Sequence, residues 1–161
     1  MTIHEEIDSK QILVLGIGNV LLGDEGVGVQ VIKELEKLDL PSNVDLLDGG
    51  TGGFHLLSYL QEYPRVILID AMLDDSRPGT IKVIYPRFSN EFPRTLSSHD
   101  IGLKDLIESA SLLGKLPVIT LIAISVAPEQ EMAMELSAEI SVAVHEAVGK
   151  IMEILQIANQ R

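Results

Sequence analysis

Short runs of consecutive apolar residues alternate along this chain with segments in which apolar residues recur every three or four positions. The runs are rich in Val, Ile and Leu, which is typical of strands buried on both faces of a sheet. They predict strands over residues 11–17, 44–47, 65–70 and 117–124. The spacing of three and four predicts helices over 31–38, 54–63, 101–113 and 136–155, each with one apolar face.

One further strand, over residues 81–85, follows its predecessor through a short link that carries Pro78 and Gly79 but has no helical pattern. Such a link is too short for a helical crossover, so we expect this strand to run antiparallel to the strand before it. The pattern as a whole predicts an α/β fold, a three-layer sandwich whose mixed, mostly parallel sheet of about five strands carries helices on both faces. We expect a single domain over residues 1–161, with residues 1–10 as a polar N-terminal extension.

The composition excludes several classes of protein. Of 161 residues, 24 are Asp or Glu and 12 are Lys or Arg, so the net charge is -12, which opposes binding to nucleic acid. Because the chain has no cysteine, it has no disulfide scaffold and no cysteine nucleophile, and a bound metal must use Asp, Glu, His or backbone oxygen. The start lacks a signal-peptide pattern and no apolar run reaches about 18 residues. We therefore expect a cytoplasmic protein with no nucleic-acid or membrane partner.

Acidic, amide and imidazole groups follow the predicted strands at one edge of the sheet, where ligands bind in folds of this class. They come from separate segments and are Asn19, Asp24, Glu25, Asp48, Asp70 and His99. Glu25, Asp70 and His99 form a mixed carboxylate and imidazole set that suits a divalent transition metal such as nickel, zinc or manganese. If they lie at the rim of the sheet, these side chains are exposed, and their replacement leaves no cavity in the core.

Other interpretations of the same residues remain open. Gly16-Ile17-Gly18 followed by Asp48 has the spacing of a dinucleotide site, although Leu21 replaces the third glycine and the acids at 24 and 25 would repel a pyrophosphate. Asp24 or Glu25 could simply cap the helix that follows, Asp70 could begin a turn, and His99 could be an ordinary loop residue. Glycines 49, 50, 52 and 53 suit either a flexible turn or a close approach by a peptide backbone.

Four sequence blocks in this order resemble the hydrogenase maturation proteases: residues 16–28 (GIGNVLLGDEGVG), 48–51 (DGGT), 69–71 (IDA) and Ser98-His99. Members of this family remove a C-terminal extension from the large subunit of nickel–iron hydrogenases. The resemblance extends over residues 12–148 and implies that Glu25, Asp70 and His99 contact the metal. It also implies substrate contacts at Asn19 and in the second block, at Asp48, Gly49, Gly50 and Thr51. The chain departs from the family at Ser125-Val126-Ala127, where a glycine and an acidic residue are more common.

The resemblance implies an endopeptidase that meets nickel already inserted in its precursor substrate. We therefore expect no permanently bound cofactor, although other divalent ions fit the same ligands, and we expect a monomer whose partner is the large-subunit precursor. The catalytic candidates are Glu25, Asp70, His99 and Asp24, and it stays open whether a carboxylate or the metal activates the reacting groups. The alternatives are a non-catalytic, metal-sensing chaperone and a nucleotide-binding module on the same fold.

Overall fold

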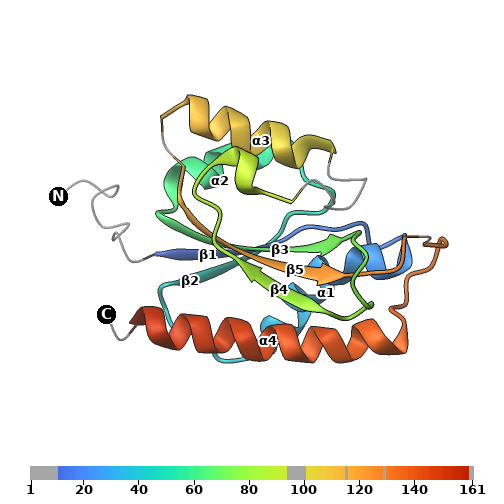
Figure 1. Ribbon diagram of the computed structural model, residues 1–161. Coiled ribbons are helices and arrows are strands. Elements are labelled where there is room, and N and C mark those ends of the chain that lie inside the picture. The colour runs from blue at the N-terminus through green and yellow to red at the C-terminus, as the bar shows by residue number, and fades with distance from the viewer. Residues whose placement is uncertain (1–10, 94–100, 115, 129, 160–161) are drawn as a thin grey trace.

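The computed structural model of this chain describes residues 11–93, 101–114, 116–128 and 130–159, with the backbone alone at 101–104 and 159. Within these residues, five strands join into one sheet in the order β2-β1-β3-β5-β4 (Figure 1). Neighbouring strands run parallel except at the edge, where β4 is antiparallel to β5. The strands are β1 (Ile12–Gly16), β2 (Val44–Asp48), β3 (Arg65–Met72), β4 (Ile81–Ile84) and β5 (Val118–Ser125).

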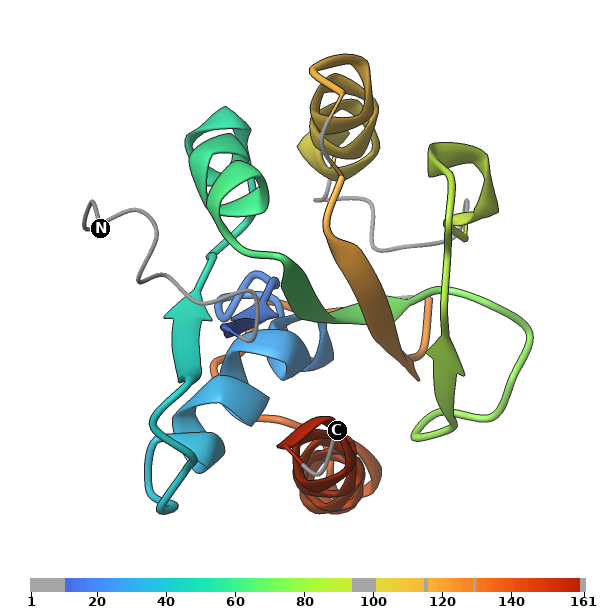
Figure 2. The same cartoon turned by 90° about the vertical axis from the view of Figure 1, so that its left-hand side faces the viewer.

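Helices cover both faces of this sheet, as Figure 2 shows from one end. The helices α1 (Val27–Leu35) and α4 (Ala138–Asn159) pack on one face, while α2 (Leu57–Glu62) and α3 (Ile101–Leu112) pack on the other. The short 3-10 segments η1 (Gly23–Gly26), η2 (Phe54–Leu56) and η3 (Ser89–Glu91) lie between these elements. Alternate residues of β3 enter opposite cores, with Ile67 and Ile69 toward α1 and α4 and Val66 and Leu68 toward α2 and α3. The predicted three-layer α/β sandwich is confirmed.

The edge strand β4 has a different neighbour from the one that its position in the sequence suggests. It runs in the expected direction, but its hydrogen bonds go to β5, which lies between it and β3. The reason is burial, because β5 is buried over most of its length, whereas the four residues of β4 are exposed or partly exposed. A strand buried in this way needs partners on both sides, so the short, half-exposed strand takes the edge.

Among the element ends that differ from the predicted ones, three affect the core or the candidate site. The helix α1 ends at Leu35, and Leu38 remains 44% exposed in the turn that follows. The helix α4 begins at Ala138, so Leu136 packs on the core from the segment before the helix. The strand β3 continues to Met72, which places Asp70 inside the strand and not at its end. Residues 1–10, predicted to be an extension, lie outside the described residues.

Candidate functional site

The loops that follow β1 and β2 are joined by backbone hydrogen bonds. The N–H of Gly49 donates to the carbonyl oxygen of Gly16 at 2.8 Å, and the N–H of Gly18 donates to that of Gly50 at 2.7 Å. Because these residues lie at the carboxyl ends of two adjacent parallel strands, the first two sequence blocks meet at one edge of the sheet. This is the edge at which the sequence predicts the site.

The glycine-rich loop after β2 is a tight turn closed by its own aspartate. Oδ1 of Asp48 accepts a hydrogen bond from the N–H of Gly50 at 2.9 Å. Gly50 has a φ of 55°, in the left-handed region that favours glycine. Gly49 is buried, whereas Asp48 and Thr51 are exposed. The loop therefore presents a carboxylate and a hydroxyl to solvent on a turn that glycine makes possible.

Asn19 closes the loop after β1 onto η1. Its side-chain oxygen accepts a hydrogen bond from the N–H of Leu21 at 3.0 Å, and its own N–H donates to the carbonyl oxygen of Glu25 at 3.2 Å. These bonds shape the loop that carries the acidic pair. The structure thus assigns Asn19 a local role in shaping the loop, and its predicted contact with substrate stays a prediction.

Asp24 does not cap the helix that follows it. Gly26 is the N-cap residue of α1 and makes no side-chain capping hydrogen bond. The carboxylate of Asp24 instead accepts two hydrogen bonds from Ser137, from the backbone N–H to Oδ1 at 2.7 Å and from the hydroxyl to Oδ2 at 2.8 Å. Gln130 supports the same segment, because its side-chain oxygen accepts from the N–H of Asp24 at 2.9 Å. Asp24 therefore joins η1 to the residue that precedes α4.

These two partners of Asp24 were missed in the sequence. Ser137 lies 113 residues away from Asp24, and Gln130 lies 106 residues away, so no local spacing connects them. In the sequence, Ser137 falls within the predicted last helix, over 136–155, and Gln130 carries no signal of its own.

Asp70 is fully buried in β3, the central strand of the sheet, two residues before the carboxyl end of that strand. Alternation along β3 places its side chain on the face of α2 and α3, between the core residues Leu68 and Met72, and its partner on β5 is Ala123. Its Oδ1 accepts a hydrogen bond from the N–H of Ala71 at 2.8 Å. Placing a carboxylate among apolar side chains is costly, and packing alone does not require it. Such a group is a candidate for function.

Glu25 is also buried, with 4% of its surface exposed, and η1, which carries it, contacts β3. The close packing depends on Gly28, where a Cβ atom would lie 2.2 Å from the carbonyl oxygen of Ile17 and 2.5 Å from that of Ile69. The prediction that the acidic site residues are exposed at the rim is therefore wrong for Glu25 and Asp70. The continuation of β3 past Asp70 and the close packing of this segment against β3 account for their burial.

His99, the third predicted ligand, lies outside the described residues. Over the ranges that the structure describes, no group of three or more His, Asp or Glu side chains is arranged to hold a metal ion. The structure thus brings Glu25 and Asp70 to neighbouring elements, and the three-residue metal site stays a prediction.

A second acidic group at this edge is held by hydrogen bonds to three different segments. Beyond β3, Asp74 accepts from the Ser125 hydroxyl at 2.8 Å, from Lys82 Nζ at 2.7 Å and from Ser76. Partial burial works to raise the pKa of Asp74, but these bonds outweigh it and lower the pKa from 3.8 to about 2. The carboxylate therefore fastens the ends of β3 and β5 to the start of β4.

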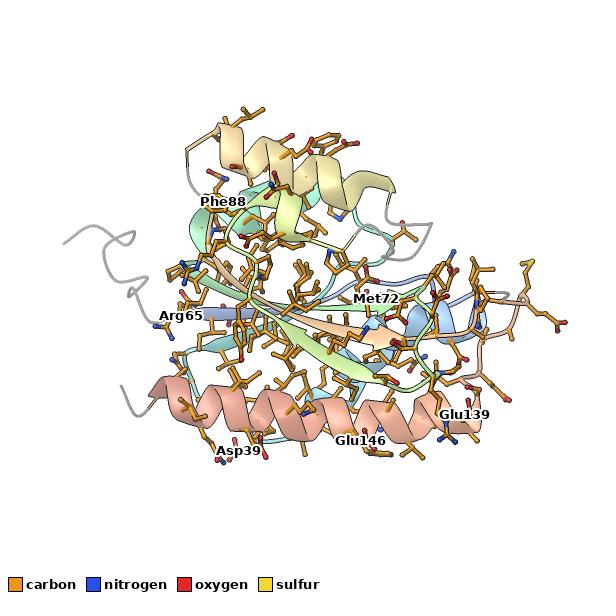
Figure 3. All side chains as sticks on the ribbon, in the orientation of Figure 1. Asp39, Arg65, Met72, Phe88, Glu139 and Glu146 are labelled. Carbon is orange, nitrogen blue, oxygen red and sulfur yellow. The ribbon has the colours of Figure 1, made fainter. Side chains whose placement is uncertain are left out.

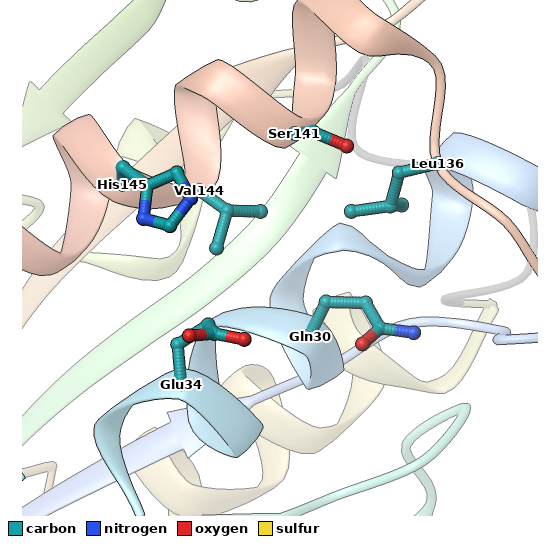
Figure 4. Close-up of a pocket in the computed structure, with 6 residues that line it drawn as sticks. All are labelled: Gln30, Glu34, Leu136, Ser141, Val144 and His145. Carbon is teal, nitrogen blue, oxygen red and sulfur yellow. The ribbon is translucent and has the colours of Figure 1, made fainter. Parts of the chain in front are cut away.

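A separate pocket of about 130 Å³ lies between α1 and α4 (Figure 4). Its lining residues are Gln30, Glu34, Leu136, Ser141, Val144 and His145. It belongs to the layer of α1 and α4, whereas Asp70 faces the layer of α2 and α3. The pocket contains none of the predicted site residues.

Among the described helices, none combines the length and the apolar composition needed to cross a bilayer.

Comparison with known proteins places this architecture in one family. A family model of hydrogenase maturation proteases matches residues 29–154. The hydrogenase expression/formation protein HupD of Bradyrhizobium diazoefficiens is 42% identical over 113 residues, which cover 67% of this chain and 58% of HupD. The hydrogenase 2 maturation protease of Escherichia coli is 36% identical over 110 residues, covering 66% of this chain and 67% of that protein.

The fold agrees with the same assignment. The solved structure of the hydrogenase maturating endopeptidase HybD from Escherichia coli is similar with a TM-score of 0.83 and 30% identity, covering 92% of this chain and 93% of that one. The chain spans a little over half of the length of the first HupD relatives, between 53% and 58%. The sequence blocks, the sheet order and these similarities agree, and this chain belongs to the hydrogenase maturation protease family.

Proposed function

We propose that this chain is an endopeptidase that removes the C-terminal extension from the nickel-loaded precursor of a nickel–iron hydrogenase large subunit. The observation that carries the proposal is the pair of buried carboxylates, Glu25 and Asp70, at the carboxyl edge of a sheet that matches the endopeptidase HybD with a TM-score of 0.83. Burying two acids at a ligand-binding edge is costly for folding and useful for chemistry.

In this proposal, nickel is part of the substrate. Glu25, Asp70 and His99 complete the coordination of a nickel ion that the precursor already holds, and this contact positions the scissile peptide bond. Carboxylate and imidazole ligands without a thiolate suit a borderline divalent ion, and other divalent ions fit the same set. The protein itself then needs no permanently bound cofactor, because the metal arrives with the substrate.

The chemical step needs a water molecule activated beside the peptide carbonyl. A carboxylate accepts the proton of that water, and the amide nitrogen must gain a proton as it leaves. Both oxygens of Asp24 already accept hydrogen bonds from Ser137, which favours a positioning role for Asp24. We assign the proton transfer to Glu25 or Asp70, because both are buried carboxylates near the carboxyl ends of the strands, and perturbed acids of this kind gather at functional sites. The proposal keeps the expectations of a monomer that acts in the cytoplasm.

The experiment is cleavage of a purified, nickel-loaded large-subunit precursor, followed by mass spectrometry of the released peptide. The proposal predicts one released C-terminal peptide and a shortened large subunit. A stable complex of the two proteins without cleavage would reject the endopeptidase and favour the non-catalytic chaperone.

A further inference from the structure

Three exposed apolar side chains stand beside the loops of the candidate site. Leu21 is 52% exposed in the loop after β1, and Met132 and Met134 are 81% and 71% exposed in the segment between β5 and α4. We call residues 130–137 the Met loop. Figure 1 shows this part of the chain, in orange, beyond the carboxyl ends of the strands. These side chains stay largely exposed after folding, so they contribute little to the hydrophobic core.

The Met loop is fixed to the loop that precedes η1. The N–H of Ala133 donates to the carbonyl oxygen of Leu21 at 3.0 Å, and the N–H of Gly23 donates to that of Ala133 at 2.7 Å. Leu22 and Ala133 form a parallel bridge. Asp24 bonds to Gln130 and Ser137, which are the two ends of the Met loop. The loop is thus held at both ends and, through Ala133, at its centre. Side chains on an ordered backbone bind a partner with less loss of entropy.

The side chains and charges of this surface define the chemistry of its partner. Methionine is flexible and polarizable, and it packs against apolar groups of varied shape. Glu131 and Glu135 flank the two methionines, and both are exposed in a chain of net charge -12. A complementary partner therefore presents apolar side chains next to Lys or Arg.

We propose that Leu21, Met132 and Met134 form the docking surface for the large-subunit precursor, through a precursor segment in which apolar residues lie beside basic ones. This inference rests on the proposed function and adds to it the place and chemistry of substrate docking. The surface is continuous with the candidate site, because the Met loop bonds to Asp24 and Glu25 is the next residue. A precursor seated there lies beside the acidic edge.

The test compares M132S/M134S with wild-type protein and with L112S/L113S as a matched control. Leu112 and Leu113 are 88% and 63% exposed at the end of α3. This end lies just before the start of β5, whose first residue Val118 pairs with Arg65. Figure 3 shows Arg65 and Met72 at opposite ends of the sheet, so the control lies away from the site. Because all four side chains are exposed, no variant opens a core cavity, and circular dichroism checks the fold.

Steady-state cleavage of nickel-loaded precursor is measured for each protein. For M132S/M134S we expect KM to rise about tenfold and kcat to stay within about twofold, while the control matches wild type. E131Q/E135Q is expected to raise KM about threefold at low salt and to weaken its dependence on ionic strength. An unchanged KM in M132S/M134S overturns the inference, and so does a loss of kcat alone.

Two further measurements separate this inference from its competitors. Biolayer interferometry with nickel-free precursor, which the proposal expects to be cut much more slowly, gives the Kd of the intact precursor for each variant, so the docking surface is tested even if the endopeptidase proposal fails. A rise of about tenfold in Kd for M132S/M134S supports docking. Sedimentation velocity tests the occupant, because a wild-type dimer that M132S/M134S turns into a monomer, with unchanged Kd for the precursor, would assign the surface to a second copy and overturn the proposal.

Discussion

At the scale of single residues, the central feature is a pair of buried acids. Position in the sequence predicted that Glu25 and Asp70 lie near the carboxyl ends of parallel strands, and the structure has them on neighbouring elements there, while their role in the site stays a prediction. Their burial was not predicted. Ala71 and Met72, which are apolar and extend β3, were the signal that Asp70 lies inside the strand. The tight packing at Gly28 depends on contacts with Ile17, just after β1, and with Ile69 of β3, and local sequence does not reveal it.

Asp70→Asn tests whether this residue serves chemistry or the fold. Asparagine has the same size and keeps an Oδ1 that accepts from the N–H of Ala71, so the variant opens no cavity. We expect the free energy of unfolding to change by no more than about 2 kcal/mol and the cleavage rate to fall by at least about 100-fold. Urea unfolding and peptide release measure the two effects. Unfolding of the variant together with loss of cleavage would point to a structural role, and Glu25→Gln gives the parallel test.

At the scale of elements, apolar runs predicted the strands of the sheet, and helical periodicity predicted the helices of the two layers that cover it. The ends of these elements differ from the predicted ones by a few residues. The hydrogen-bonding partner of β4 could not be predicted in this way, since the order of strands follows from burial of β5. The tie between η1 and the start of α4 was equally hidden, because it joins Asp24 to a residue 113 positions away.

This tie predicts energetic coupling between the two elements. Asp24→Ala removes the acceptor of two hydrogen bonds, and Ser137→Ala removes the hydroxyl that makes one of them. Hydrogen bonds to charged groups contribute about 1.5–3 kcal/mol each, so Asp24→Ala, which loses two, should cost roughly 3–6 kcal/mol and Ser137→Ala, which loses one, about 1.5–3 kcal/mol. In urea unfolding, the double variant should lose less than the sum of the single losses. Strictly additive losses would mean that the hydroxyl bond contributes nothing.

Asp74 predicts a pH dependence of stability at the edge where β3, β4 and β5 meet. Its pKa is about 2 in the folded protein against 3.8 unperturbed, so its contribution, on the order of 2 kcal/mol, is present above about pH 4 and is lost as the pH falls toward 2. Asp74→Asn should therefore lower the free energy of unfolding at pH 7 and weaken the loss of stability between about pH 4 and pH 2. Unfolding curves between pH 2 and 7 measure both. If the variant lost stability at acid pH as steeply as the wild type, other carboxylates would be the cause of that loss.

At the scale of the whole molecule, the family and the three-layer fold could be read from the order of four short blocks and the alternation of strands and helices. The complete site could not be predicted in this way, because it would join residues from separate segments. Of these, His99 lies outside the described residues. The molecule as a whole places buried acids beside an exposed apolar surface at one edge of the sheet. This is the arrangement expected if the proposed precursor docks on the apolar surface beside the buried acids.

If substrate-bound nickel directs cleavage, as proposed, nickel-loaded and nickel-free precursors must be processed at different rates, and comparing the two rates tests this. Coordination by Glu25, Asp70 and His99 would supply binding free energy that positions the scissile bond, and accurate positioning can lower a barrier by several kcal/mol. We predict that the nickel-loaded precursor releases its C-terminal peptide at least about 100-fold faster than the nickel-free one, as followed by mass spectrometry under single-turnover conditions. Equal rates of release from the two precursors would contradict this account.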